Sequence, residues 1–174
     1  MAFELAVAQR ETWCLRMLEY DFENSVGFWI CAASHDYQLA FNEELSPQGI
    51  TYRQAQVLGC LSLNGPSSQS VLAERMGIEP PTLVGILDRM ERDGWIRRDE
   101  DKSDRRRKLI HPTSAARPVW SKIVECAIRV RERATRGMTP AQLKQLKKLL
   151  KLVQANLKSE EMQHATDALA REAG

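Results

Sequence analysis

The sequence contains few cysteines and no long apolar run, and both absences restrict the kind of protein that it encodes. Its 174 residues include four cysteines, which are widely separated and form no Cys-x-x-Cys pair, so we expect free thiols in a reducing compartment. The longest stretch without a charged residue, 54–73, contains an Asn-Gly-Pro sequence and four serines. It therefore cannot form an apolar span of about 20 residues, and we expect no contact with a membrane.

Signals for secretion and for catalysis are missing as well. Glu4 and Arg10 interrupt what would have to be the apolar core of a signal peptide, which favours a cytoplasmic protein. The sequence has no glycine-rich phosphate loop, no nucleophile elbow and no pair of carboxylates in a plausible catalytic arrangement. We therefore expect neither an enzyme nor a bound cofactor or metal.

The composition is that of a globular protein, but the charges are distributed unevenly. Charged residues make up 28% and apolar residues 43%, which argues against disorder, and the length suits one domain with or without extensions. Residues 1–44 carry two arginines against eight acidic residues, whereas 129–151 carry eight basic residues against one glutamate, and 97–108 carry seven against four. Such basic segments usually mark solvated helix faces, but they can also mark an anionic partner such as DNA.

Apolar periodicity and turn residues predict a mainly α-helical chain with a small β-hairpin. Six helices are expected, or seven if residues 3–20 contain a further one. Helices are expected at 25–45, 51–64, 67–77, 80–94, 113–136 and 139–158, and short strands at 95–98 and 108–111. Residues 159–174 are expected to form a frayed or partner-held tail.

Local signals predict several helix starts. Thr51 and Gln54 have the spacing of a capping box, and one of the serines at 67–68 can cap the next helix. The proline pair at 80–81 fits only the first positions of a helix, where the missing N–H groups need no partner.

Residues 69–88 have the spacing of a helix-turn-helix. Ala73 is small enough for two helices to cross closely, and Gly77 supplies the positive φ of a tight turn four residues later. This spacing alone fits any αα-corner equally well. The predicted hairpin with a basic tip directly after the second helix favours a winged helix-turn-helix. In that fold the helix enters the major groove of DNA, and the wing contacts the backbone or the minor groove.

Residues 25–115 resemble the MarR family (multiple antibiotic resistance regulators) of dimeric winged helix-turn-helix transcription factors. The matching segments read GITYRQ at 49–54, LAERMGI at 72–78, LDRMERDGWIRR at 87–98 and DRR at 104–106. The resemblance implies a homodimer with interlocked N- and C-terminal helices that binds a pseudo-palindromic operator on double-stranded DNA, more often as a repressor than as an activator. It also implies release from DNA by a small, often aromatic, anionic effector.

Four regions follow from the resemblance and from the predicted helices. They are N-terminal dimerisation helices at 1–48, a winged helix-turn-helix DNA-binding domain at 49–112, C-terminal dimerisation helices at 113–158 and the tail at 159–174. The apolar stripes of the terminal helices exceed what a winged domain of about 90 residues can cover, which independently favours a dimer. The alternative is a self-contained helical subdomain.

The DNA-binding residues are expected on the wing and on the second helix of the motif. By resemblance, Arg106 is the wing-tip residue that enters the minor groove, and Asp104 orients it. Arg105 and Arg107 face phosphate or water. The groove-facing positions of the helix are Pro81, Thr82, Val84, Gly85, Asp88 and Arg89.

This groove-facing set is unusually apolar. Thr82 can hydrogen-bond to a base or a phosphate, whereas Pro81 and Val84 can only contact thymine methyl groups. Relatives commonly carry a larger polar or basic residue at Gly85, so we expect one direct base contact to be absent and specificity to rest on DNA shape and the wing. Arg89 is expected to reach a phosphate or to pair across the domain.

The start of the first motif helix is a second candidate phosphate site. Ser68, Gln69 and Ser70 lie where free N–H groups and the helix dipole suit an anion. Because Ser68 is also needed as the cap, Gln69 is the better phosphate ligand.

The resemblance places the effector pocket between the dimerisation helices and the DNA-binding lobe. Candidate residues are Trp29, His35 and Tyr52, with Arg16 for an acid group of the effector. Packing in the core is the alternative role for each, because aromatic and histidine side chains on amphipathic helices more often belong to the core.

Two other functions stay open at this point. One branch of the family senses peroxide through a cysteine early in the first long helix, but Gly27 occupies that position, and the candidate thiols here are Cys31, one turn later, and Cys14. Cys31 and His35 could share a metal, yet two ligands make a poor site. The other function is a winged-helix module that binds a protein and no operator.

Overall fold

The structure is a computed structural model, and it describes residues 20–101 and 108–172, with side chains described through residue 159. The chain divides into two compact units, the first ending at Ala127 and the second beginning at Ile128. The division falls inside a helix, and each unit is described by itself.

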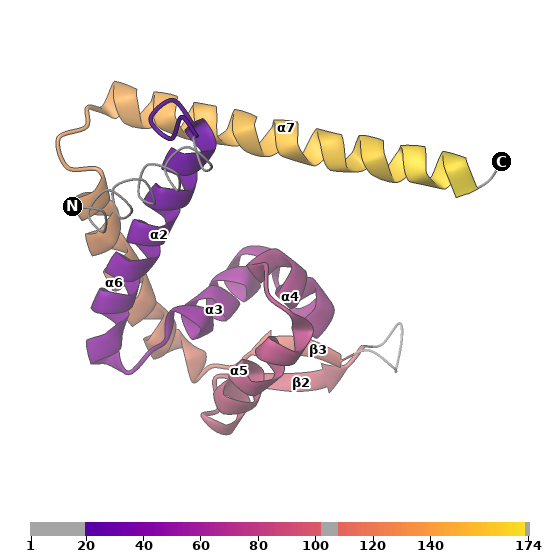
Figure 1. Cartoon of the computed structure of the whole chain (residues 1–174). Helices are drawn as coiled ribbons and strands as arrows, with labels where there is room; N and C mark the ends of the chain where they lie inside the picture. The colour runs from indigo at the N-terminus through magenta and orange to yellow at the C-terminus, as the bar shows by residue number, and fades with distance from the viewer. Residues whose placement is uncertain (1–19, 102–107, 173–174) are drawn as a thin grey trace, which may run out of the picture. The chain divides into compact units, whose positions relative to one another are not determined.

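The described residues form six α-helices, one short 3-10 helix and three strands (Figure 1). In chain order these are α2 (Val26–Leu45), η1 (Ser46–Gln48), α3 (Tyr52–Asn64), β1 (Ser67–Ser68), α4 (Gln69–Met76), α5 (Pro80–Arg92), β2 (Ile96–Glu100), β3 (Lys108–Pro112), α6 (Ala116–Ala134) and α7 (Pro140–Glu172). The predicted class, mainly α with a small β wing, is confirmed. Within the described ranges, no helix is long and apolar enough to cross a bilayer.

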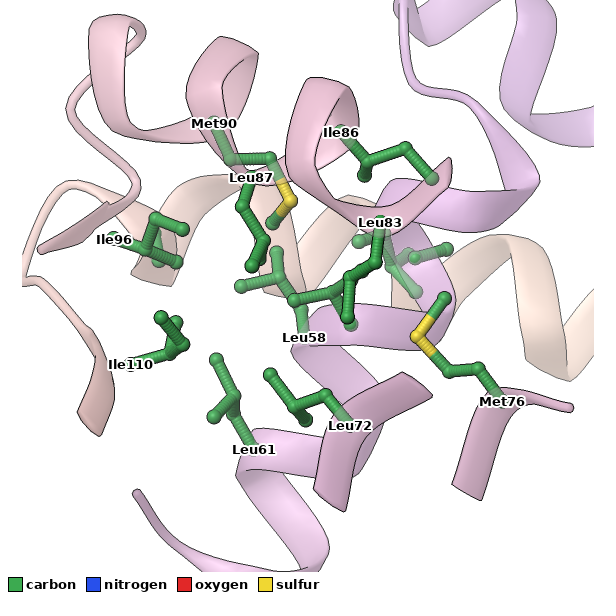
Figure 2. Packing of buried hydrophobic residues seen from close by; sticks show 14 of the residues in the cluster. Leu58, Leu61, Leu72, Met76, Leu83, Ile86, Leu87, Met90, Ile96 and Ile110 are labelled. Atoms are coloured by element: carbon green, nitrogen blue, oxygen red, sulfur yellow. The ribbon is translucent and has the colours of Figure 1, made fainter. Parts of the chain in front are cut away.

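The core of the first unit lies between α3, α4, α5 and the sheet. Figure 2 shows leucine, isoleucine and methionine side chains of these elements converging on one interior. The most deeply buried of them are Leu72, Leu83, Leu87, Met90, Ile96 and Ile110. Burying a side chain of this size contributes about 1.5–3 kcal/mol, so this core holds α5 against the wing strands.

The strands form an antiparallel sheet in the order β1-β3-β2, whereas the sequence predicts only a two-stranded hairpin. On one edge of β3, Ile110 pairs with Arg98 of β2, and on the other edge it pairs with Ser67 of β1. Two serines have no strand propensity of their own. They become a strand because the extended segment before α4 passes the open edge of β3, and the pairing covers that edge.

The predicted helix starts are confirmed. The Thr51 hydroxyl accepts a hydrogen bond from the Gln54 N–H at 3.2 Å, and the Gln54 side chain accepts one from the Thr51 N–H at 2.9 Å, which completes the capping box. Ser68 caps α4 by accepting from the Val71 N–H at 3.4 Å. Pro80 occupies the first turn of α5, where it displaces no hydrogen bond.

Helix α6 is shorter than the predicted helix at 113–136. Its start is delayed because Thr113 belongs to the connection with the wing: the Thr113 hydroxyl donates to the Gly94 carbonyl at 2.5 Å, and its N–H donates to the Trp95 carbonyl at 2.9 Å. Its end comes two residues early, before Gly137, whose φ of 82° is left-handed.

Helix α2 leaves most of its apolar side chains exposed. Only Ala40 and Leu45 are buried in it. Around its N-terminus, four exposed aromatic rings form an edge-to-face series with centroid distances of 4.8 to 5.3 Å, made by Tyr20, Phe22, Phe28 and Trp29. The first unit therefore presents an apolar surface along α2.

In the second unit, α7 continues to Glu172, whereas the sequence suggested a tail from residue 159. Residues 141–173 contain neither proline nor glycine and are rich in alanine, leucine, lysine and glutamate, which are good helix formers. Among the described side chains of α7, the exposed leucines are Leu146, Leu149, Leu150, Leu152 and Leu157.

Candidate nucleic-acid interface

Helix α5 has one buried face and one free face. The buried residues are Leu83, Ile86, Leu87 and Met90. The exposed residues include every predicted groove-facing position, namely Pro81, Thr82, Val84, Gly85, Asp88 and Arg89. At about 100° per residue these positions fall on one side of the helix, so the structure brings them together on a single surface.

A tight turn at Gly77 joins α4 to α5. Gly77 has a φ of 60°, in the left-handed region, and its N–H donates to the Glu74 carbonyl at 3.1 Å. The Ile78 N–H donates to the Ala73 carbonyl at 3.1 Å and closes the end of α4. Ala73 is buried in the apolar core that the two helices share. The helix-turn-helix predicted from the spacing of these residues is therefore present.

The start of α4 presents Gln69 and Ser70 beside the capping Ser68. The hydroxyl oxygens of Ser68 and Ser70 are 3.0 Å apart and share a hydrogen bond. The Gln69 side chain donates to the Pro80 carbonyl at 3.5 Å, so it reaches from α4 to the first turn of α5. Ser68 is buried and already serves as the cap, which leaves Gln69 and Ser70 as the residues that a phosphate can reach.

Arg89 folds back along its own helix. Its Nε donates to the Gly85 carbonyl at 3.1 Å, and the side chain stays exposed. This bond uses only Nε, so the two terminal guanidinium nitrogens are the groups that would meet a phosphate. Arg89 forms no ion pair with the adjacent Asp88 in the described structure.

Asp88 pairs with Arg98 of β2, a residue that the sequence analysis did not single out. Arg98 Nη2 lies 2.6 Å from Asp88 Oδ1, and Nη1 lies 2.5 Å from Glu91 Oε2. The Arg98 backbone N–H also donates to Glu91 Oε1 at 3.1 Å. We call these three residues the Arg98 bridge. Sequence shows two acids three residues apart and a later arginine; only the packing of β2 on α5 brings them together.

The predicted wing-tip residues, Asp104, Arg105, Arg106 and Arg107, lie outside the described residues. The strands on either side of them are described, and their pairing ends with Glu100 opposite Lys108. The segment between these two residues therefore connects adjacent ends of one antiparallel ribbon, which is the connection that a wing requires.

Comparison with known proteins identifies this arrangement. The model described as MarR family matches residues 50–108, which extend from the turn before α3 to the start of β3. The chain is similar to the MarR family over this winged helix-turn-helix segment. A relative in Bacillus subtilis, described as the uncharacterized HTH-type transcriptional regulator YwoH, is 34% identical over 82 residues. The match covers 47% of this chain and 59% of YwoH, less than two thirds of that protein's length.

Solved structures share the fold. CouR from Rhodococcus jostii, bound to p-coumaroyl-CoA, is 26% identical, with a TM-score of 0.66 over 78% of this chain and 95% of CouR. A mutant MarR from E. coli complexed with operator DNA is 24% identical, with a TM-score of 0.65 over 74% of this chain and 92% of that chain. Both likenesses confirm the winged helix-turn-helix fold of this chain.

The predicted effector residues that the structure describes lie on α2 and α3. Trp29 and His35 are exposed on α2, whereas Tyr52 of α3 packs edge-to-face on Phe41, with ring centroids 6.0 Å apart. Phe41 follows Trp29 by 12 residues on α2, which is about 18 Å along the helix axis. Trp29 and Tyr52 therefore lie far apart in one copy. Arg16 lies outside the described residues.

Tyr52 has the properties of a packing residue. Its ring is half-buried, and burial raises the pKa of the Tyr52 hydroxyl. The Gln56 side chain donates a hydrogen bond to the Tyr52 oxygen at 3.3 Å. Tyr52 is thus neutral at physiological pH and already has a polar partner on its own helix.

Two clefts of the first unit are lined by residues that the sequence analysis did not place in a pocket. The larger, about 380 Å³, lies between α3, the end of β3 and the start of α6 and is lined by Leu58, Ser62, Pro112, Thr113, Ser114, Ala116, Arg117 and Trp120. The smaller, about 310 Å³, is lined by Asn42, Ser46, Gly49, Ile50 and Thr51. Neither lining includes Trp29, His35 or Tyr52.

The described cysteines are free thiols in different surroundings. Cys31 is exposed on α2, and Cys126 is buried. Burial raises the pKa of the half-buried Cys60 thiol, with a smaller opposing effect from Arg75. Among the described side chains, no group of three or more potential ligands could hold a metal, so Cys31 and His35 gain no further ligand. Cys14 lies outside the described residues, and peroxide sensing stays a prediction.

Proposed function

We propose that the chain is a transcriptional repressor that binds a pseudo-palindromic operator on double-stranded DNA as a homodimer. The observation that carries the proposal is the free face of α5, which presents all the groove-facing positions beside the two wing strands. A helix with one free face, followed directly by a ribbon, fits the major groove and the adjacent backbone or minor groove. The operator-bound MarR neighbour supports this use of the fold.

The proposed dimer is supported by the apolar surface that each unit leaves open. The first unit exposes the aromatic series around α2, and the second exposes leucines along α7. Exposed apolar patches of this kind mark interaction sites, and two-fold symmetry is the commonest way for a chain to cover them with a second copy. Two recognition helices related by a two-fold axis then require a palindromic site.

Sequence recognition by this surface would depend mainly on shape. Thr82 is the groove-facing residue that can hydrogen-bond to a base edge, while Pro81 and Val84 can contact thymine methyl groups. Gln69, Ser70 and the guanidinium of Arg89 are available for phosphates. Arg106 with Asp104 would supply the minor-groove contact, with Arg105 and Arg107 on the backbone.

A small aromatic or anionic effector is part of the proposal. A structural neighbour, BpsR from Bordetella bronchiseptica, is described as regulated in DNA binding by 6-hydroxynicotinic acid, and CouR is bound to p-coumaroyl-CoA. Because Trp29 and Tyr52 are far apart in one copy, an effector site that used both, with His35 and Arg16, would combine residues of two copies. Such a site would link the ligand to DNA affinity through the dimer geometry.

The test begins with selection of DNA from a random pool by the purified full-length protein. We expect enrichment of a palindrome with half-sites one helical turn apart, and sedimentation as a dimer. Affinity for the selected site should fall by orders of magnitude between about 50 and 200 mM salt because phosphate contacts release counterions. We expect a protein with this DNA partner to be found in the cytoplasm.

A pair of charge variants localises the interface. Val84→Glu adds a negative charge to the free face of α5 and should weaken operator binding at least tenfold, roughly the effect of a lost major-groove contact. Leu63→Glu makes the same kind of change at an exposed residue of α3, outside both the free face of α5 and the proposed dimer surface, and should have no such effect. No enriched sequence, or a monomer that binds the selected site tightly, contradicts the proposal and favours a protein-binding module.

A further inference from the structure

We propose that Arg98 is a positioning residue that sets the angle between α5 and the wing strands, and that this angle determines how well the protein distinguishes its operator from other DNA. The inference rests on the proposed function, since both elements must contact DNA. Arg98 itself acts through Asp88 and Glu91 and is not placed on the DNA.

The contacts of Arg98 constrain rotation as well as distance. Three separate donors, Nη1, Nη2 and the backbone N–H, all bind carboxylates of α5. Asp88 and Glu91 are three residues apart and so lie about one turn apart on the same side of the helix. A planar guanidinium held by two carboxylates has a fixed orientation, and the backbone bond transfers that orientation to β2.

The Arg98 bridge differs from the surface ion pairs of the same region. The Arg98 side chain is 19% exposed, although its partners Asp88 and Glu91 are 57% and 39% exposed. In the Arg92–Asp93 pair the side chains are 72% and 40% exposed, and the charged atoms are 3.7 Å apart. Exposed pairs contribute little because water and salt screen them. The contacts of Arg98 are short, they engage two carboxylates at once, and the guanidinium is largely buried, so they can fix a geometry.

Arg98 lies at the point where the wing joins the domain. It is the central residue of β2 and pairs with Ile110 of β3, which is buried and pairs in turn with β1. The apolar core fixes the distance from α5 to the strands, but apolar contacts have no direction. The bridge adds direction in the middle of β2, where the sheet still has three strands, so a small rotation there becomes a larger displacement at the far end of the wing.

A change in this angle should affect specific binding more than nonspecific binding. Phosphates repeat along any DNA duplex, so either element can still find phosphate contacts after a rotation. Operator contacts require the helix and the wing to be in their grooves at the same time. Loosening the bridge should therefore lower the ratio of operator to nonspecific affinity.

The first experiment measures that ratio. For Arg98→Met, we expect the operator Kd to rise about tenfold, the size of a one-base mismatch, while the Kd for random-sequence DNA of equal length changes less than about twofold. Arg97→Met removes the same charge from the same strand, where Arg97 pairs with Asp99 of its own strand, and should leave the ratio unchanged. Ile96→Val weakens the core beside the bridge and should lower the melting temperature without changing the ratio.

The second experiment needs no DNA. Residual dipolar couplings of the backbone amides report the orientation of α5 relative to β2 and β3 in the full-length protein, and Arg98→Met should change or average that orientation while Arg97→Met does not. An unchanged orientation in Arg98→Met, or equal losses of affinity for operator and random DNA, overturns the proposal. A wild-type protein that selects no operator, combined with a changed orientation in Arg98→Met, refutes the proposed function and leaves the positioning role intact.

Discussion

Replacing Gly85 by alanine should stabilise the protein, although this glycine lies in the middle of the proposed DNA-reading helix. A methyl group at position 85 would meet no other protein atom within 4 Å, and the backbone there is helical. Alanine in a helix interior is more favourable than glycine by about 0.8–1.0 kcal/mol, because glycine loses more backbone freedom on folding. Since no clash opposes this gain, we expect nearly all of it.

The gain can be measured by urea unfolding and by the melting temperature, which should rise by about 2–4 °C in a chain of this length. Gly59→Ala in α3 is a matched control, because a methyl group there also meets no atom within 4 Å, and it should give the same gain. Gly77→Ala should do the opposite and destabilise by about 1–2 kcal/mol, since its φ of 60° strains any residue with a Cβ.

The same substitutions separate stability from DNA binding. Because glycine has no side chain, the exposed backbone at Gly85 can approach DNA closely. Gly85→Ala should therefore bind the operator several-fold more weakly, whereas Gly59→Ala should bind it normally. Gly85→Arg should not weaken binding to nonspecific DNA. If Gly85→Ala is no more stable than the wild type while Gly59→Ala is, the assignment of open space at position 85 is wrong. Equal operator affinities of both variants would place the interface elsewhere.

Three further predictions concern the wing, a helix cap and the thiols. Arg106→Ala should lower operator affinity by about 1–3 kcal/mol; equal affinities at fixed salt would rule out the wing-tip assignment. Ser68→Ala should lower the free energy of unfolding by about 1 kcal/mol in urea titrations through loss of the α4 cap, whereas Ser70→Ala, at an exposed hydroxyl, should have less than half that effect. Iodoacetamide at pH 7.5 should alkylate exposed Cys31 before Cys60. The alkylation rate of Cys60 should keep rising above pH 9, because burial raises the pKa of that thiol and its thiolate forms only at higher pH. Peptide mass mapping that shows the reverse order of alkylation would contradict this.

The effector site stays a prediction, and its residues show what helical spacing alone cannot determine. Trp29 and Tyr52 are aromatic residues on helices that the family resemblance places beside one pocket. In the fold, Tyr52 meets Phe41 near the other end of α2, and Trp29 joins the exposed aromatic series. Helical spacing tells which residues share a face, but the contact of α3 with α2 decides which end of that face each residue meets.

The sequence by itself determined the features that depend on residues within one turn of each other. The capping box of Thr51, the left-handed turn at Gly77 and the proline start of α5 were all readable, because each rests on backbone geometry that a few neighbouring residues impose. The alternation of buried and exposed positions on α5 followed from the same local periodicity.

Only the tertiary structure decided what joins these elements. Strand β1 exists because the edge of β3 lies beside two serines that would otherwise be a loop. The Arg98 bridge exists because β2 returns along α5 at one particular register. Both depend on contacts between segments that the chain brings together from a distance, and a pattern of side chains along one segment carries no information about the register or angle at which another will pack against it.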